Sequence, residues 1–435
     1  MQKKLLAIAI AAAVTAPVAA RADVTVYGQM HYSYDYVMAA EDEGATGVSR
    51  YSRIGFKGAE DLGGGLKGVW QIESQIANNS ADGGFTLRNT FVGLAGDWGT
   101  VLAGRHDTPY KISTQKLDFF TDRAADYNNL IGAITVPTIR TVTINGVLTE
   151  VDVPTGYSSG DERAPQTIAY VTPNWSGFSG ALAYISHYFD QSATGSTTAC
   201  PTLANSGNLC VTSSGDEDDT AFSAMLMYDN AGFFATVAYE WGTGNQLVGV
   251  LAPGLVTNLK TSVESLAALE VPPVAGIAAS RIAIEDPELS SWKVGLGYTF
   301  GGTTIGAIWE NIEVKADNAT ALDATGAVIE SVSIDDFDRG AYYLTAQHVF
   351  GANVIKGYYG WTDDTGSIND SGADMWAVGY DYNFSKRTTL YALYTQVAND
   401  DNAGYTANSA QGVGSAYSNP GDDVDVVSVG VIHKF

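Results

Sequence analysis

The last nine residues constrain the fold more than any other part of the sequence. They run from Val427 to Phe435, and the chain stops on this aromatic residue. The odd-numbered positions form a mostly apolar face, and the opposite face carries Ser, Gly and Lys, as in a β-strand. Nothing follows this strand that could cover its edge, so its backbone groups need a partner. The natural partner is the first strand, and that pairing would close a barrel.

The first 22 residues have the features of a secretory signal. Lys3 and Lys4 form a charged start, residues 5–14 are apolar, and Ala20-Arg21-Ala22 is an A-x-A cleavage site. Ten apolar residues are too few to span a bilayer as a helix. We therefore expect cleavage after Ala22 and one domain over residues 23–435. An exported chain that ends in a barrel-closing strand indicates an outer-membrane β-barrel.

The composition agrees with this fold class. The chain has 48 Gly and 24 Tyr but only 23 Lys plus Arg, which is typical of many strands, tight turns and aromatic girdles. Loss of the signal would move the formal charge from −25 to −28. Phosphate repels such an acidic chain, so we expect no nucleic-acid partner.

The spacing of turns predicts the number of strands. Seven short turns rich in Gly, Asn and Asp are each flanked by alternating sequence, and eight longer polar segments separate them. The turns are residues 61–65, 96–99, 174–177, 229–232, 300–302, 351–353 and 383–387. The long segments are about 38–49, 77–85, 106–162, 190–219, 243–290, 316–337, 363–373 and 398–423. Fifteen connections join sixteen strands, enough to enclose an aqueous channel, with both termini on the short-turn, periplasmic side.

Alternation within the strands predicts which side chains face lipid. Trp292, Leu296 and Tyr298 share one face, and Lys293 lies on the other. Apolar residues toward lipid and polar residues toward a water-filled lumen would fit this pattern. A soluble β-sandwich would also alternate, with its polar face outside.

The cysteines and histidines indicate structure more than chemistry. Cys200 and Cys210 lie in one polar loop of an exported chain, so we expect a disulfide that staples this loop. The five His residues show no metal-ligand spacing, and no nucleophile-elbow pattern surrounds a serine. We therefore expect no metal, cofactor or enzymatic activity. Whether the acidic loops bind Ca²⁺ is left open.

Four segments carry a resemblance to a known family: residues 52–67, 88–100, 382–391 and 433–435. With them the sequence resembles the general, trimeric porins of Gram-negative outer membranes. The resemblance implies an all-β, sixteen-stranded antiparallel transmembrane barrel with the third extracellular loop folded into the lumen. It also implies a homotrimer for the passive diffusion of ions and small hydrophilic solutes.

The resemblance further implies a basic wall at the constriction of the channel. The residues matching that wall are Arg53, Arg88, Arg105 and Arg163, with Lys57 on the same face as Arg53. An arginine facing lipid at mid-depth would cost about 2–4 kcal/mol, so the lumen face is preferred. Some of these residues could instead be ordinary lumen charges away from the constriction.

The third long loop departs from the family pattern. Asp118, Asp122 and Asp126 recur every four residues and would share one face of a helical turn, opposite the arginines. The alternative is a solvated loop face. Residues 141–151 predict a β-hairpin around Asn145-Gly146 that could narrow the channel mouth or decorate the outside.

These observations predict an outer-membrane porin. The alternatives are a channel specific for a sugar or an anion, and a non-conducting structural or adhesive barrel. The surplus of acidic residues favours cations, and the arginine wall opposes this. We expect Phe435 to be an assembly signal for the barrel-assembly machinery, and outer-membrane lipid and lipopolysaccharide to surround the barrel.

Overall fold

The computed structural model describes residues 23–39, 43–76, 85–134, 141–144, 147–150, 157–158, 163–186, 210–214, 220–243, 281–285, 288–315, 318–322, 328–333, 337–366, 369–407 and 421–435. The predicted signal peptide lies outside these residues. In the described residues, no helix is long and apolar enough to cross a membrane.

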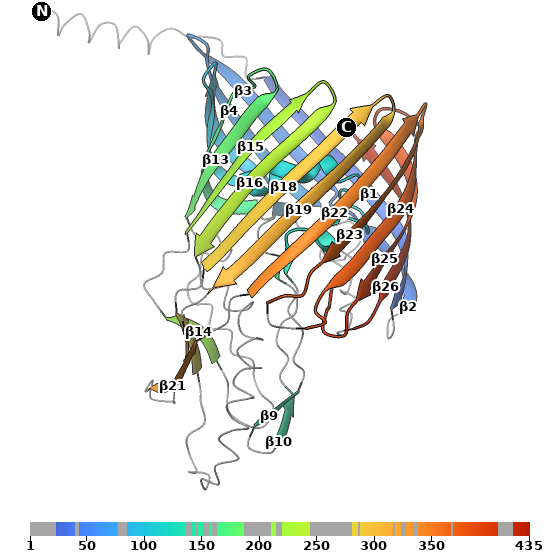
Figure 1. Cartoon of the computed structure of the whole chain (residues 1–435). Coiled ribbons are helices and arrows are strands. Elements are labelled where there is room, and N and C mark those ends of the chain that lie inside the picture. Colours follow the sequence, from blue (N-terminus) through green and yellow to red (C-terminus); the bar gives the residue numbers. More distant parts are fainter. Residues whose placement is uncertain are drawn as a thin grey trace, which may run out of the picture.

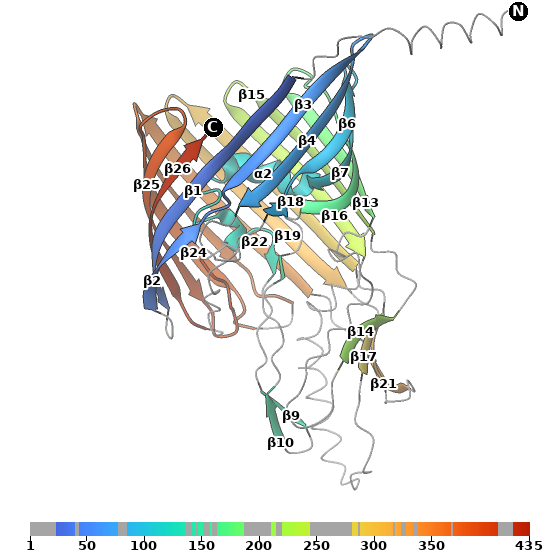
Figure 2. The same ribbon diagram turned by 180° about the vertical axis from the view of Figure 1, so that it is seen from behind.

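Sixteen antiparallel strands form one closed ring, as the turn count predicts (Figures 1 and 2). Each pairs with the next along the chain. The ring strands are β1 (Asp23–Ala39), β3 (Arg53–Gly63), β4 (Leu66–Ile76), β6 (Thr90–Gly96), β7 (Gly99–Asp107), β12 (Arg163–Val171), β13 (Phe178–Ser186), β15 (Thr220–Asn230), β16 (Phe233–Thr243), β18 (Glu288–Phe300), β19 (Thr303–Lys315), β22 (Phe337–Phe350), β23 (Asn353–Thr362), β24 (Ala373–Asn383), β25 (Thr388–Asn399) and β26 (Val424–Lys434).

The first and last strands close the ring. β26 pairs with β1 in a register that runs from Gln29 opposite Lys434 to Ala39 opposite Val424. Beyond it, Gly28 and Phe435 exchange two backbone hydrogen bonds of 3.1 Å each. The expectation that the terminal strand pairs with the first one is therefore confirmed.

All seven predicted short turns connect neighbouring ring strands, and Figure 1 shows the C-terminus at the same end as these turns. In the first turn, Gly63, Gly64 and Gly65 all have positive φ, which explains why three glycines stand there.

The first predicted long loop, residues 38–49, is wrong in extent. Strand β2 (Glu43–Ser49) occupies most of it and pairs with the far half of β1, from Tyr32 opposite Ser49 to Met38 opposite Glu43. The 17 residues of β1 extend beyond β3, so a second partner satisfies their backbone groups. The short β5 (Phe85–Leu87) extends β4 in the same way.

Further strands lie outside the ring. The predicted hairpin is confirmed, since β9 (Thr141–Ile144) pairs with β10 (Val147–Glu150). β8 (Ala133–Ile134) pairs with β11 (Tyr157–Ser158). β14 (Cys210–Ser214), β17 (Arg281–Glu285), β20 (Asn318–Leu322) and β21 (Val328–Ser333) form a separate four-stranded sheet that the sequence analysis did not predict.

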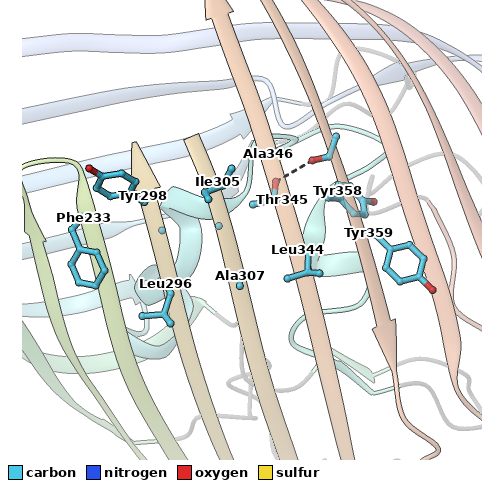
Figure 3. A pocket seen from close by; sticks show the side chains of 13 residues that line it. Phe233, Leu296, Tyr298, Ile305, Ala307, Leu344, Thr345, Ala346, Tyr358 and Tyr359 are labelled. Carbon is cyan, nitrogen blue, oxygen red and sulfur yellow. Dashed lines mark hydrogen bonds between the residues drawn. The ribbon is translucent and has the colours of Figure 1, made fainter. Parts of the chain in front are cut away.

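The outer wall is apolar. Trp292 is 47% exposed, whereas Lys293 next to it is fully buried, so the predicted alternation holds. A hollow of about 660 Å³ lies on the outward face of β16, β18, β19, β22 and β23. Figure 3 shows side chains that line it. Small residues such as Gly297, Ala307 and Ala346 line it, and Leu296 and Leu344 flank them. The membrane-facing belt is therefore apolar but not smooth.

Candidate functional site between the barrel wall and the segment after β7

The chain leaves β7 into a compact segment of short helices, drawn near the label α2 in Figure 2. It contains α2 (Pro109–Thr114), η1 (Gln115–Leu117) and η2 (Tyr127–Asn129). The hydroxyl of Thr108 accepts a hydrogen bond from the backbone N–H of Lys111, and Pro109 begins the helix, which is a favourable helix start.

One side of this segment is apolar and packs on glycines of the wall. A Cβ added to Gly306 would lie 2.7 Å from Leu117, one added to Gly379 would lie 2.7 Å from Phe120, and one added to Gly360 would lie 3.1 Å from Leu130. These three apolar side chains are almost fully buried, and burial of each contributes about 1.5–3 kcal/mol.

The wall beneath them also contributes apolar side chains. Phe234, Ile308, Tyr343, Met375 and Tyr391 belong to the same buried cluster. On this side of the ring the inner face is therefore not uniformly polar as expected, because apolar side chains of the segment pack against part of it.

A buried carboxylate holds both ends of the segment. Glu310 of β19 accepts hydrogen bonds from the Tyr110 hydroxyl at 2.7 Å and from the Gly132 backbone N–H at 2.6 Å. It also pairs with Arg339 at 3.0 Å and with Lys293 at 3.6 Å, and all three charged side chains are fully buried. This cluster, Glu310 with Arg339 and Lys293, is called the clamp below.

Arg339 extends the clamp. Its guanidinium donates to the carbonyl oxygens of Leu130, at 2.7 Å, and Ala133. It also reaches the hydroxyl of Tyr405 at 3.5 Å. The end of the segment is therefore held at its backbone, independently of its side chains.

A second buried ion cluster holds the middle of the segment. Asp381 of β24 pairs with Arg123 at 2.9 Å and with Lys356 of β23 at 2.8 Å. Lys356 and Arg123 also donate to the backbone carbonyl of Phe119. The sequence analysis did not single out these residues, although the alternation that places Lys293 inward would also place Lys356 and Asp381 inward.

Of the three aspartates, only Asp122 lies against the predicted basic wall. Its carboxylate accepts hydrogen bonds from Arg53 at 2.9 Å and from Gln29 at 3.0 Å. Asp122 itself has a φ of +62°, a left-handed conformation that no helical turn contains.

Asp118 and Asp126 point into the segment instead and are 7% and 6% exposed. Asp118 accepts a hydrogen bond from the backbone N–H of Phe120, and Asp126 accepts from those of Asp122 and Asn128. The predicted helical face is therefore wrong, because these carboxylates satisfy turns of the chain. Burial raises the pKa of Asp118 well above its usual value and raises the pKa of Asp126 to about 6.

The predicted basic residues lie on neighbouring strands of the opposite wall, from β3 to β12. Arg88 pairs with Glu73 at 2.6 Å, and Arg163 pairs with Asp107 at 3.0 Å. Arg105 and Arg88 both lie close enough to repel the Arg163 guanidinium. Arg88, Arg105 and Arg163 thus belong to one group, and Arg53 lies on β3 of the same wall.

Two carboxylates that face this group, Glu73 and Asp107, were missed by the sequence analysis. Glu73 also accepts a hydrogen bond from the Tyr27 hydroxyl at 2.9 Å. Lys57 lies nearer the short turns, with its ammonium 5.0 Å from the centre of the Tyr27 ring.

The remaining predicted sites are the pair of cysteines and the terminal Phe435. Cys200 lies outside them, so its disulfide with Cys210 stays a prediction. The Phe435 ring covers Gly28, where an added Cβ would lie 2.7 Å from it. No group of three His, Cys, Asp or Glu is placed to hold a metal ion within the part of the chain that the structure describes.

Comparison with known proteins agrees with the barrel fold described above. The family model described as Gram-negative porin matches residues 7–402. The major outer membrane protein P.IA of Neisseria meningitidis serogroup C is 26% identical over 464 aligned residues and covers all of both chains. Outer membrane porin protein 32 of Delftia acidovorans is 26% identical over 447 and also covers all of both. Among solved structures, an anion-selective porin from Comamonas acidovorans gives a TM-score of 0.63 at 22% identity, covering 95% of this chain and 100% of that one.

Proposed function

The chain belongs to the Gram-negative porin family, and from this premise we propose how its channel selects solutes. It is an outer-membrane porin, a passive channel for ions and small hydrophilic solutes. Its relatives are porins, which are not enzymes, and we propose no catalytic role for it.

The constriction is the slot between the segment after β7, which is the third extracellular loop, and the arginines of β3 to β12. In this proposal the loop fills the apolar side of the lumen and leaves the arginine side to water. Exposure of the ion pairs carries the argument: Arg53 and Asp122 keep 23% and 15% of their side chains exposed, whereas the clamp is fully buried.

The slot has more positive than negative charge. Arg53, Arg88, Arg105 and Arg163 provide four cations, and Lys57 adds a further positive charge nearer the short turns. Glu73, Asp107 and Asp122 are the carboxylates paired or bonded with them. Charges beyond a Debye length of about 8 Å are screened at physiological salt, so local charge outweighs the acidic total. We therefore propose a preference for anions, against the weaker expectation drawn from composition.

The assembly is proposed on similar grounds. A solved outer membrane protein of Vibrio cholerae with a related fold is described as a trimer form, with a TM-score of 0.55 at 14% identity. We propose a homotrimer surrounded by outer-membrane lipid and lipopolysaccharide. In this proposal the barrel-assembly machinery recognises Phe435.

The test is single-channel recording of the refolded protein in a planar bilayer under a salt gradient. An anion-selective reversal potential that moves toward zero in the Arg53→Gln and Arg88→Gln double variant supports the proposed slot. Arg387→Gln, in the exposed β24–β25 turn, is the matched control and should change nothing. An unchanged reversal potential in the double variant contradicts the slot.

Other outcomes of the same recording separate the alternatives. Closure in steps of three supports the trimer. Block by one solute at low concentration would favour a specific channel, and a folded barrel without conductance would favour a structural role.

A further inference from the structure

A three-residue gap separates β2 from β3, and both of its outer residues are fixed. Arg50 is buried, pairs with Asp35, and donates its backbone N–H to the carbonyl of His31. Ser52 exchanges hydrogen bonds of 3.0 Å with the backbone of His31, and its carbonyl accepts from the N–H of Ile76 at 2.6 Å. The middle residue of the gap, Tyr51, is therefore held from both sides.

Tyr51 has a φ of +50°, which is rare for a bulky residue and costs on the order of 1–3 kcal/mol. Asp122, across from the wall, is a second non-glycine residue with positive φ beside the slot. Strained backbone of this kind gathers at functional sites, where the surrounding structure over-determines it. The strained backbone of Tyr51 therefore points to a functional role as well as a packing role.

The side chain of Tyr51 is half-buried and lies between the two sides of the slot. The guanidinium carbon of Arg88 is 5.9 Å from the centre of its ring, within cation–π range. The carboxylates of Asp122 and Asp126, on the loop side, act electrostatically on its phenol group. The ring therefore occupies width that a solute would otherwise use.

We propose that Tyr51 is a specificity-determining residue of the channel, whose ring sets the size limit for hydrophilic solutes at the slot. The proposal rests on the slot being the path of permeation. The rigid backbone on either side of Tyr51 keeps the ring in place, and Arg88, itself fixed by Glu73, packs beside it. A fixed ring gives a sharp limit, whereas a mobile side chain would give way to larger solutes.

The test compares Tyr51→Gly with Tyr51→Phe. Glycine adopts positive φ without strain, so this variant relieves the strained backbone while losing the ring. We expect a larger single-channel conductance for Tyr51→Gly and entry of larger neutral sugars in liposome-swelling assays with a graded oligosaccharide series. Phenylalanine keeps the ring, so Tyr51→Phe should retain the parent conductance and size limit.

Two results would overturn the proposal. If Tyr51→Gly keeps the parent conductance and size limit while the arginine variants shift the reversal potential, the slot is the path but Tyr51 does not limit it. If Tyr51→Phe behaves like Tyr51→Gly, the hydroxyl group and not the ring sets the limit. Failure of the arginine variants as well would show that the slot itself is misplaced, so the two proposals fail in distinguishable ways.

Discussion

Replacement of Glu310 by Gln tests whether the clamp holds the third loop. The change keeps the size of the side chain but removes the carboxylate that pairs with both Arg339 and Lys293. It also weakens the hydrogen bonds from the Tyr110 hydroxyl and the Gly132 N–H, because a neutral amide oxygen is a weaker acceptor than a carboxylate.

The expected magnitude follows from burial. Removing one partner of a buried ion pair costs about 3–5 kcal/mol, because the remaining charge is left uncompensated. Glu313 of the same strand is the matched control: it pairs with Lys315 at 2.7 Å, but its side chain is 32% exposed. Loss of an exposed pair costs only about 0–1 kcal/mol.

The assay is urea unfolding of each variant in lipid vesicles, with the free energy of unfolding as the readout. Current noise of single open channels provides a second readout, since a loosened loop should fluctuate in the lumen. If Glu310→Gln loses no more stability than Glu313→Gln and its open channel is equally quiet, the clamp does not hold the loop.

Three further predictions concern the slot, the buried Asp126 of the loop, and the pairing of β1 with β26. Asp122→Asn should shift the reversal potential further toward anions, whereas Asp118→Asn should leave it unchanged, because Asp118 is buried in the loop; equal shifts would contradict this placement. Burial raises the pKa of Asp126 to about 6, above the ordinary 3.8, so the folded loop keeps a proton that the unfolded chain releases. This destabilises the fold as pH rises from about 4 to about 6, and Asp126→Asn should flatten the dependence of unfolding free energy on pH in this window; an unchanged profile would refute it. Deletion of Phe435 removes the ring over Gly28 and two backbone hydrogen bonds, so it should slow formation of the heat-resistant folded form on gels; parent kinetics would contradict this.

The ring of strands could be predicted from sequence because its signals are local. Gly63-Gly64-Gly65 marks a turn wherever it occurs, and the alternation of Trp292 with Lys293 shows two faces without knowledge of any partner. The extent of β2 could not be predicted in this way. β2 forms because β1 extends beyond β3 and needs a second pairing partner, whereas the residues of β2 itself are mostly small or polar.

The site was less predictable, since its contacts join distant segments. Alternation places Glu310 and Lys293 on the inner face, but it does not show that Tyr110 and Gly132 meet the same carboxylate. The spacing of Asp118, Asp122 and Asp126 suggested a helix, yet backbone N–H groups within the loop bind two of them. Arg53, Arg88, Arg105 and Arg163 came from the family resemblance, and their role in selectivity stays a prediction.

The seam between β1 and β26 determines the order in which this barrel can fold. Its hydrogen bonds join the region of Gln29 to that of Lys434, so the sequence separation of this one pairing spans almost the whole chain. Contacts between such distant segments form late, because the entropy of loop closure must be overcome first. Until β26 arrives, β1 is an open edge able to pair with foreign strands. Closure of the ring is therefore a single, late event that depends on the pairing of β26 with β1.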